Sequence, residues 1–160
     1  MASRYAVFDV SARAPIIGSS EIEIRAEAEL VWDVLTDFEG WPSWNQDVKS
    51  ISMQGDVVEG STFRWKAGPG TITSIVRCVV PPRFIGWTGK TLGITAIHFW
   101  WLDGRAGTTF VRTAESYEGL VARLFRWPLQ KTLESGLENG LRYLKEEAER
   151  RAARETVRQT

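Results

Sequence analysis

The sequence predicts a single α+β domain in which one antiparallel sheet is covered by one long C-terminal helix. Two patterns carry this prediction: a series of short strand-like segments separated by turn residues, and a sustained apolar stripe of helical period near the C-terminus. At 160 residues the chain is long enough for one domain with a substantial core. We expect this domain to span residues 16–150, between an N-terminal arm (residues 1–15) and a frayed helical end (residues 151–160).

The first two elements are distinguished by a change in the spacing of apolar residues, from that of a strand to that of a helix. Residues 16–24 alternate between apolar and polar positions, as a half-buried strand does. Residues 25–38 then carry apolar side chains at helical spacing, with acidic residues in the first turn, where the helix dipole favours them. Residues 41–45 are interrupted by a proline, so we expect a short helical turn or a loop carrying Trp41 and Trp44.

Strand-like segments follow in series. Turn residues such as Gly68-Pro69-Gly70 and Pro81-Pro82 separate them. Segments joined by such short breaks pair as antiparallel neighbours, and the last two form a hairpin that turns near Gly104 and Arg105. The segments are residues 48–53, 62–66, 70–80, 84–88, 91–102 and 108–118.

The last element is a long amphipathic helix over residues 125–148. Charged residues fall mostly on one side of it and apolar residues on the other. Pro128 lacks a backbone donor and clashes one turn back, so the helix either begins near Trp127 or is kinked there, with residues 120–126 as a separate or bent first segment. The apolar stripe consists of Leu129, Leu133, Leu137, Leu141, Leu144 and Ala148.

Two glycines, Gly136 and Gly140, project on the apolar side of this helix. A glycine inside a helix costs roughly 1 kcal/mol relative to alanine. Two of them on the inward face therefore indicate either close packing against the sheet or space that is left open. A curved sheet around one helix also leaves a space between them, unless large side chains fill it.

Composition excludes several function classes. Equal numbers of basic and acidic residues, 20 of each, leave no net charge with which to bind nucleic acid or an anionic membrane. One histidine and one cysteine, Cys78, exclude a multi-ligand metal site and an internal disulfide, and we expect no cofactor. The N-terminus lacks the apolar run of a signal peptide and no stretch approaches membrane-spanning length, so we expect a cytoplasmic protein without integral membrane association.

Several short motifs occur in a characteristic order. They are Ile24-Arg25-Ala26, residues 31–37, Trp41-Pro42-Ser43-Trp44-Asn45, Pro81-Pro82-Arg83, Trp87, His98-Phe99-Trp100-Trp101-Leu102, Gly107-Thr108-Thr109 and Glu115-Ser116-Tyr117-Glu118-Gly119. Together, over residues 16–150, they resemble the START-like (SRPBCC) superfamily, and most closely its polyketide cyclase/dehydrase-like branch. The resemblance implies a helix-grip fold: a seven-stranded antiparallel sheet wrapped around a long C-terminal helix, with two short helices after the first strand. It also implies an apolar cavity that holds lipids, polyketides or similar ligands.

His98 and Glu115 are the candidate catalytic residues. They lie on the last two strands, on one face and about one diagonal step apart, roughly 7–8 Å. A histidine beside a carboxylate suits enolisation, aldol cyclisation or dehydration of a carbonyl compound. The alternatives are that the pair anchors a polar group of a ligand, or that both residues are only structural.

Aromatic residues on several strands indicate a wide, mostly apolar pocket. The other interpretation is that these rings fill the interior as core. Trp41 and Trp44 are expected at the cavity mouth, as a lid or as a plug of the core, and the kink at Pro128 would gate the same mouth. The expected ligand-binding residues are Trp41, Trp44, Phe63, Trp65, Trp87, His98, Trp100, Val111, Thr113, Glu115, Tyr117, Phe125, Leu129, Leu133, Gly136, Leu137 and Gly140.

Three functions remain open on this sequence. The first is binding of an apolar or aromatic small molecule, such as a lipid or polyketide, between the sheet and the C-terminal helix. The second is a cofactor-independent cyclase/dehydrase-type, lyase-like enzyme with His98 and Glu115 as acid and base. The third is a protein-interaction module that docks a partner through one exposed patch of Trp41, Trp44 and Trp101.

The strand over residues 91–102 is apolar on both faces. One face can pack against the C-terminal helix, so the outer face of the sheet needs a cover of its own. A partner subunit in a homodimer would supply it, and so would the N-terminal arm.

Overall fold

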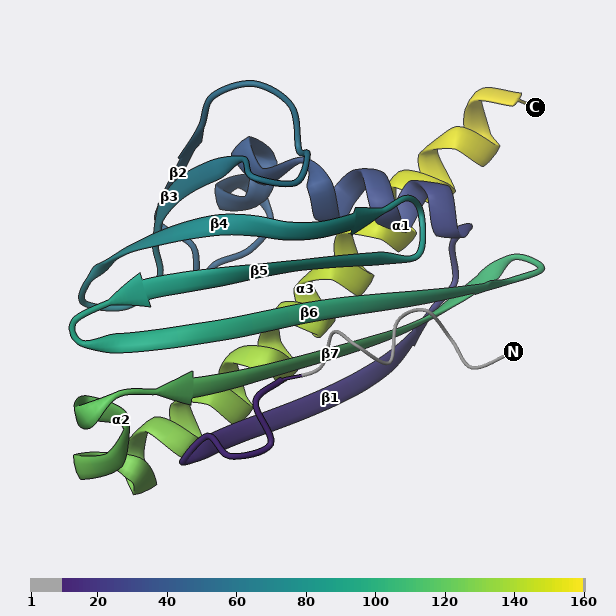
Figure 1. The fold of residues 1–160 in the computed structure, drawn as a ribbon. Coiled ribbons are helices and arrows are strands. Elements are labelled where there is room, and N and C mark those ends of the chain that lie inside the picture. Colours follow the sequence, from purple (N-terminus) through teal and green to yellow (C-terminus); the bar gives the residue numbers. More distant parts are fainter. Residues whose placement is uncertain (1–9, 160) are drawn as a thin grey trace.

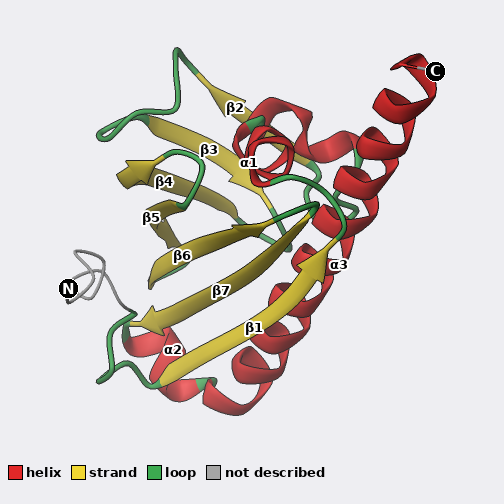
Figure 2. Cartoon of the chain, turned by 90° about the vertical axis from the view of Figure 1, so that its right-hand side faces the viewer, coloured by secondary structure: helices red, strands yellow, loops and turns green. Residues whose placement is uncertain are grey.

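Seven antiparallel strands form one open sheet in the order β1-β7-β6-β5-β4-β3-β2, and a long helix, α3 (Arg126–Gln159), lies across one face of it (Figure 1). The computed structural model describes residues 10–159. Seen from the side, the sheet curves around α3 (Figure 2). This is the helix-grip α+β fold that the family resemblance implied. The strands are β1 (Ile16–Ile24), β2 (Ser50–Met53), β3 (Thr62–Lys66), β4 (Thr71–Val80), β5 (Phe84–Thr91), β6 (Ile94–Arg105) and β7 (Thr108–Glu118).

Two short helices follow β1, as expected. The first, α1 (Ala28–Thr36), turns its apolar residues inward. The second, η1 (Phe38–Ser43), is a 3₁₀ helix that includes Trp41 and ends before Trp44. The side chain of Asp37 caps it by accepting a hydrogen bond of 3.3 Å from the Gly40 amide.

Two hairpin turns lie later in the chain than the sequence indicated. Between β5 and β6 the turn is at Leu92 and Gly93, which have φ values of 45° and 77°, rather than at Gly89-Lys90. Gly89 lies within β5, where a Cβ would stand 3.1 Å from a methyl of Ile72. Between β6 and β7 the turn uses Gly107, with φ of 78°, instead of Gly104 and Arg105. Both turns were predicted too early in the chain because the prediction relied on glycine as a turn residue. Glycine also occurs inside strands, where a neighbouring chain segment approaches closely.

The C-terminal helix is divided as one of the two alternatives proposed. A separate short helix, α2 (Leu120–Leu124), precedes α3, and Pro128 lies in the first turn of α3, where no backbone donor is needed. The helix also continues past Ala148 to Gln159, so the predicted helical end over residues 151–159 is part of α3. Arg150 and Arg151 both contact the Glu147 carboxylate, at 2.6 and 2.7 Å, and support this extension. No helix within residues 10–159 combines the length and apolarity needed to cross a bilayer.

The buried apolar residues form two clusters, and α3 contributes to both. The larger cluster joins aromatic residues of η1, β3, β5 and β6 to Leu141, Leu144 and Ala148 of α3. The smaller cluster joins Leu133 and Leu137 to residues of β1 and α2. The interior is therefore packed in two parts along the helix, and the level between Leu137 and Leu141 is where they meet.

The outer face of the sheet is covered near its centre. Phe99 and Ala114 point away from α3, yet they are only 4% and 1% exposed. Ser116, on the same face, receives a hydrogen bond of 3.3 Å from the amide of Ser11. The described end of the N-terminal arm therefore reaches this face, as one of the two expected covers would. Residues 1–9 of the arm lie outside the described chain.

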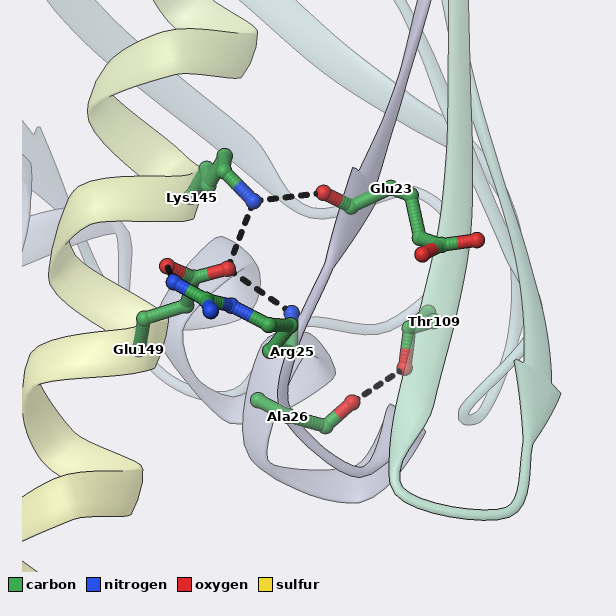
Figure 3. Close-up of polar contacts among 6 residues, drawn as sticks. All are labelled: Glu23, Arg25, Ala26, Thr109, Lys145 and Glu149. Atoms are coloured by element: carbon green, nitrogen blue, oxygen red, sulfur yellow. Dashed lines mark hydrogen bonds and ion pairs between the residues drawn. The ribbon is translucent and has the colours of Figure 1, made fainter.

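Polar side chains of α3 tie it to the edge strand β1 (Figure 3). Lys145 donates to the carbonyl of Glu23 at 2.7 Å and contacts the Glu149 carboxylate at 2.6 Å. Glu149 also accepts from the backbone amide of Arg25 at 2.9 Å. One turn from the start of the helix, Gln130 donates to the carbonyl of Ile17 at 2.9 Å. These contacts fix the helix along the length of β1.

We expect Glu149→Gln to lower the free energy of unfolding by about 1–3 kcal/mol at pH 7, because it removes a charged acceptor from two donors. Burial alone would raise the pKa of Glu149, but hydrogen bonds from Lys145 and Arg25 outweigh it and hold the pKa at about 2. Since this pKa lies below the ordinary 4.5, the contribution is present above pH 4.5 and is lost as pH falls towards 2.

Urea denaturation at pH 7 and pH 3 measures this effect. The matched control is Glu146→Gln, which breaks the exposed pair between Arg142 and Glu146 and should change stability by less than about 0.5 kcal/mol. A Glu149→Gln protein as stable at pH 7 as this control would show that the contacts in Figure 3 do not hold the helix to β1.

Candidate functional site

His98 on β6 and Glu115 on β7 lie directly opposite each other in the sheet. They are therefore closer than the diagonal step that we expected, because the hairpin turns later. Their side chains point towards α3, with Nδ1 of His98 3.7 Å from Oε2 of Glu115. Both are largely buried, with 10% and 13% of their side chains exposed. A titratable pair this deep beneath a helix is a candidate functional site on geometry alone.

Hydrogen bonds define which nitrogen of His98 carries the proton. Thr113 has one hydroxyl proton, and it donates that proton to the carbonyl oxygen of Phe99 at 3.0 Å. The Thr113 hydroxyl can then only accept from His98 Nε2, which lies 2.8 Å away. The neutral imidazole is thus protonated at Nε2, and its Nδ1 lone pair faces Glu115. Among residues 10–159, this Nδ1 has no hydrogen-bond partner.

Burial sets the charge states of the pair. It lowers the pKa of His98 to about 3 and raises the pKa of Glu115 to about 8. Near pH 7 the site therefore holds a protonated carboxyl group beside a neutral imidazole. Tyr117, two residues further along β7, has its pKa raised by burial and by the nearby Glu115.

Two tryptophans enclose the imidazole. The ring centroid of His98 lies 5.0 Å from that of Trp87 and 5.3 Å from that of Trp100. The indole Nε1 of Trp100 is buried and, within the described chain, lacks a hydrogen-bond partner. A Cβ at Gly140 of α3 would lie 3.7 Å from the Trp100 ring. Gly140 thus packs over this tryptophan, which is one of the two uses proposed for the helix glycines.

The helix packs closely over the strand next to Glu115. Glu115 pairs with Gly18 of β1, and a Cβ there would approach Leu133 and Leu137 to 3.3 and 3.1 Å. Gly136 is exposed, and a Cβ built on it would meet no atom within 4 Å. Gly136 therefore faces solvent rather than the interior, and the prediction that it projects inward with Gly140 is wrong.

The half of the interior next to η1 is filled by rings. Phe38, Trp41, Phe63, Trp65 and Trp87 contact one another with centroid distances from 4.6 Å (Phe38 to Phe63) to 6.5 Å (Phe63 to Trp65). Trp41 is 4% exposed and its indole donates to the carbonyl of Leu35 at 2.9 Å. Of the two interpretations offered for Trp41, the structure favours a plug of the core. Phe38 was absent from our list, although its spacing of three from Trp41 was a usable signal.

The other predicted ligand-binding residues lie in several different places: some share the face of Glu115, and others are half-buried or exposed. Val111, Thr113 and Tyr117 share one face of β7 with Glu115, and Leu129 packs with Tyr117 against the smaller cluster. Trp44 is half-buried beside Trp41. Phe125 is 55% exposed in the corner between α2 and α3. Since Trp41 is inside and Trp101 lies on the outer face against Arg112, the patch required by the interaction-module hypothesis is not formed.

Two surface hollows lie away from this site. One, of about 310 Å³, is lined by Phe84, Trp101, Phe110 and neighbouring residues on the outer face of the sheet. The other, of about 430 Å³, lies between the start of α1 and the end of β6. Neither is lined by the residues that we expected to bind a ligand.

Comparison with known proteins agrees with the fold. Residues 16–149 match the family model described as polyketide cyclase / dehydrase and lipid transport. No curated protein matches the sequence.

Solved structures share the fold at low sequence identity. A hypothetical protein from Helicobacter pylori is 16% identical, with a TM-score of 0.77 over 87% of this chain and 91% of that one. The Zhui aromatase/cyclase from a Streptomyces species is 20% identical, with a TM-score of 0.76 over 85% and 94%. A START superfamily protein from Mycobacterium smegmatis is 17% identical, with a TM-score of 0.73 over 84% and 97%. Because this family model covers most of its length, the chain belongs to the family described as polyketide cyclase / dehydrase and lipid transport.

Proposed function

We propose that this protein binds an apolar or aromatic small molecule between the sheet and α3, with His98 and Glu115 as its polar anchor. One observation carries the proposal: a buried imidazole nitrogen that has no hydrogen-bond partner in the described part of the chain faces a buried carboxyl group. Buried polar atoms are nearly always hydrogen-bonded, and leaving one unpaired costs about 1–3 kcal/mol. A bound ligand would supply the missing partner.

The protonation states indicate which ligand groups fit. A protonated Glu115 can donate to a carbonyl oxygen, whereas Nδ1 of His98 can accept from a hydroxyl group. A ligand with a carbonyl and a hydroxyl on carbons separated by one further carbon of an apolar skeleton would satisfy both. Polyketides and their phenolic products carry such groups, and the name of the Streptomyces aromatase/cyclase is consistent with this class.

The ligand body would lie towards the first half of α3. The end of the interior near η1 is occupied by packed rings, so the part of the interior beneath the first half of α3 is the place that remains for a ligand. Leu133 and Leu137 would then form an apolar wall, and Trp100 would offer its unpaired indole as a further donor.

A second candidate is catalysis at the same pair, which the opposite shifts of the two pKa values favour. In a dehydration, Nδ1 of His98 would take the proton from the carbon next to the ligand carbonyl. Glu115 would donate its proton to the departing hydroxyl group, so that water leaves and a carbon–carbon double bond forms. Proton transfer from the imidazolium to the carboxylate would restore both groups, without cofactor.

Native mass spectrometry of the purified protein, followed by extraction, tests ligand binding. A co-purifying apolar compound that is displaced with a change in tryptophan emission supports the proposal. An empty protein whose emission ignores a panel of hydroxylated aromatic ketones would contradict it.

We expect His98→Ala to weaken binding of such a ketone by about tenfold, because one hydrogen bond to a buried group is lost. Isothermal titration with a hydroxylated aromatic ketone measures the change. The control is Ile97→Ala, which truncates the neighbouring side chain on the outer face of β6 and should bind like the unaltered protein. Loss of turnover by about 100-fold or more in His98→Ala, on a substrate that the unaltered protein converts, would favour the enzyme over the carrier.

A further inference from the structure

A group of large apolar side chains is exposed at the corner between β7 and α3. α2 occupies this corner at one end of the molecule (Figure 1). Trp127 is the most exposed residue of the group, with 82% of its surface accessible. We call the group the corner patch; it consists of Leu92, Leu120, Leu124, Phe125 and Trp127, each more than half exposed.

The patch joins two neighbouring parts of the chain. Leu120, Leu124, Phe125 and Trp127 follow one another through α2 and the start of α3. Leu92 belongs to the β5–β6 turn, and this turn rests on α2: a Cβ at Gly93 would lie 3.2 Å from a methyl group of Val121. Exposed apolar groups gathered in this way indicate an interaction site rather than ordinary surface.

Basic residues are interleaved with the apolar ones. Arg123, Arg126 and Lys131 are all exposed, and none of them takes part in an ion pair within residues 10–159. Between Leu120 and Lys131 there is no acidic residue. The zero net charge of the whole chain, from which we expected no affinity for an anionic membrane, therefore conceals a local excess of positive charge.

We propose that the corner patch docks the protein onto the surface of an anionic lipid bilayer. Leucine, phenylalanine and tryptophan side chains enter the boundary between headgroups and acyl chains, while arginine and lysine contact lipid phosphates. The patch is built on one short helix and the first turn of another, so its side chains project from a corner and need no shaped pocket in a partner. Because the exposed charges beside the patch are positive, the bilayer that it contacts must be anionic.

Docking to a bilayer does not depend on the proposed ligand, but it would let that ligand pass from the bilayer to the proposed site. The first turns of α3 carry Trp127 on the outside and Leu129 and Leu133 on the inside. A bilayer in contact with the outside of this segment would lie next to the apolar wall of the proposed site. Apolar molecules that partition into lipid would then reach the site without crossing water.

Vesicle co-sedimentation tests the proposal directly. We expect the protein to bind vesicles of phosphatidylcholine with about one-third phosphatidylserine, and to bind pure phosphatidylcholine much more weakly. The double variant Leu124→Glu/Trp127→Glu should lose binding by about tenfold or more. Its matched control, Val58→Glu/Val157→Glu, adds the same charges at exposed apolar positions outside the patch and should lose far less.

Charge removal tests the basic residues separately. Each of Arg123→Gln, Arg126→Gln and Lys131→Gln should weaken binding to anionic vesicles by about fivefold. The triple variant Arg64→Gln/Lys66→Gln/Arg154→Gln removes three charges elsewhere on the surface, as many as the three patch substitutions combined, and should weaken binding less than that combination.

Brominated lipids report on insertion. They should quench tryptophan emission of the bound protein, and Trp127→Phe should abolish most of this quenching while leaving binding largely intact. Equal binding by the patch variant and its control would overturn the proposal. A dimer in solution that only the patch variant disrupts would also overturn it, in favour of a second copy as the occupant. Ligand titration of Leu124→Glu/Trp127→Glu without vesicles separates this failure from failure of the proposed function.

Discussion

Replacing Trp87 by alanine is expected to lower the free energy of unfolding by about 3–5 kcal/mol. Its indole is 2% exposed and contacts the rings of Phe38, Trp41 and Phe63 at centroid distances of 5.6 to 5.9 Å. Truncation would remove the ring that joins these neighbours to His98. Because the surrounding rings are rigid, the space would close only in part, and the cost of a cavity adds to the lost burial.

Thermal and urea denaturation measure the loss, and Trp127→Ala provides the matched control. Trp127 is the same side chain at 82% exposure, so its removal should change stability by no more than about 0.5 kcal/mol. The cavity left at position 87 should bind indole or benzene and recover part of the lost stability. A Trp87→Ala protein that loses less than about 1 kcal/mol would mean that the rings line a space rather than fill one.

Raising the pH from 6.5 to 8 is expected to destabilise the protein through Glu115. Its folded pKa of about 8 is higher than the ordinary 4.5, so in this range the folded state holds a proton that the unfolded state has lost. The contribution is complete below pH 4.5 and is lost as pH rises towards 8, at no more than about 1.4 kcal/mol per pH unit.

His98 acts in the opposite direction at lower pH. Burial lowers its folded pKa to about 3 from 6.5, so between these values the unfolded state binds the extra proton and stability rises with pH. From pH 4.5 to 6.5 the two slopes oppose each other, and above pH 6.5 only Glu115 remains. The pair should therefore produce a plateau of stability that ends near pH 6.5.

Glu115→Gln isolates the effect. This variant should lose the decline between pH 6.5 and 8 and keep the rise from His98 at lower pH. Urea denaturation at intervals of half a pH unit measures both, with Glu138→Gln on the exposed face of α3 as the control that should follow the unaltered protein. A decline that persists unchanged in Glu115→Gln would show that the carboxyl group is already ionised in the folded state.

Local patterns were sufficient to predict most of the fold. β1, β3 and β7 have the bounds expected from the sequence. A glycine follows β3 and β7 within two residues, and β1 ends where the period of two gives way to helical spacing. The pairing of residues on different strands was harder to predict. The hairpin turn at Gly107 moved His98 and Glu115 from diagonal to direct neighbours, and the glycine signal at residue 104 could not distinguish a turn from a close approach to Ala28.

The sequence predicted that His98 and Glu115 lie on one face of the sheet, but it did not predict their protonation states. That His98 and Glu115 face one another followed from strand alternation. That neither is charged near neutral pH, and that Thr113 selects the tautomer, depends on burial and on a hydrogen bond to the Phe99 carbonyl. Alternation carries no information on either. For the same reason the list of aromatic residues could not separate the packed rings near η1 from those next to His98.

The way α3 contacts β1 has a consequence for self-association. β1 is a nine-residue strand at the edge of the sheet, with a row of backbone groups that another chain could pair with. Gln130 and Lys145 already occupy two of its outward carbonyls, those of Ile17 and Glu23. The opposite edge, β2, is only four residues long. Both edges are thus poor templates for strand addition, so α3 also protects the sheet against edge-to-edge aggregation.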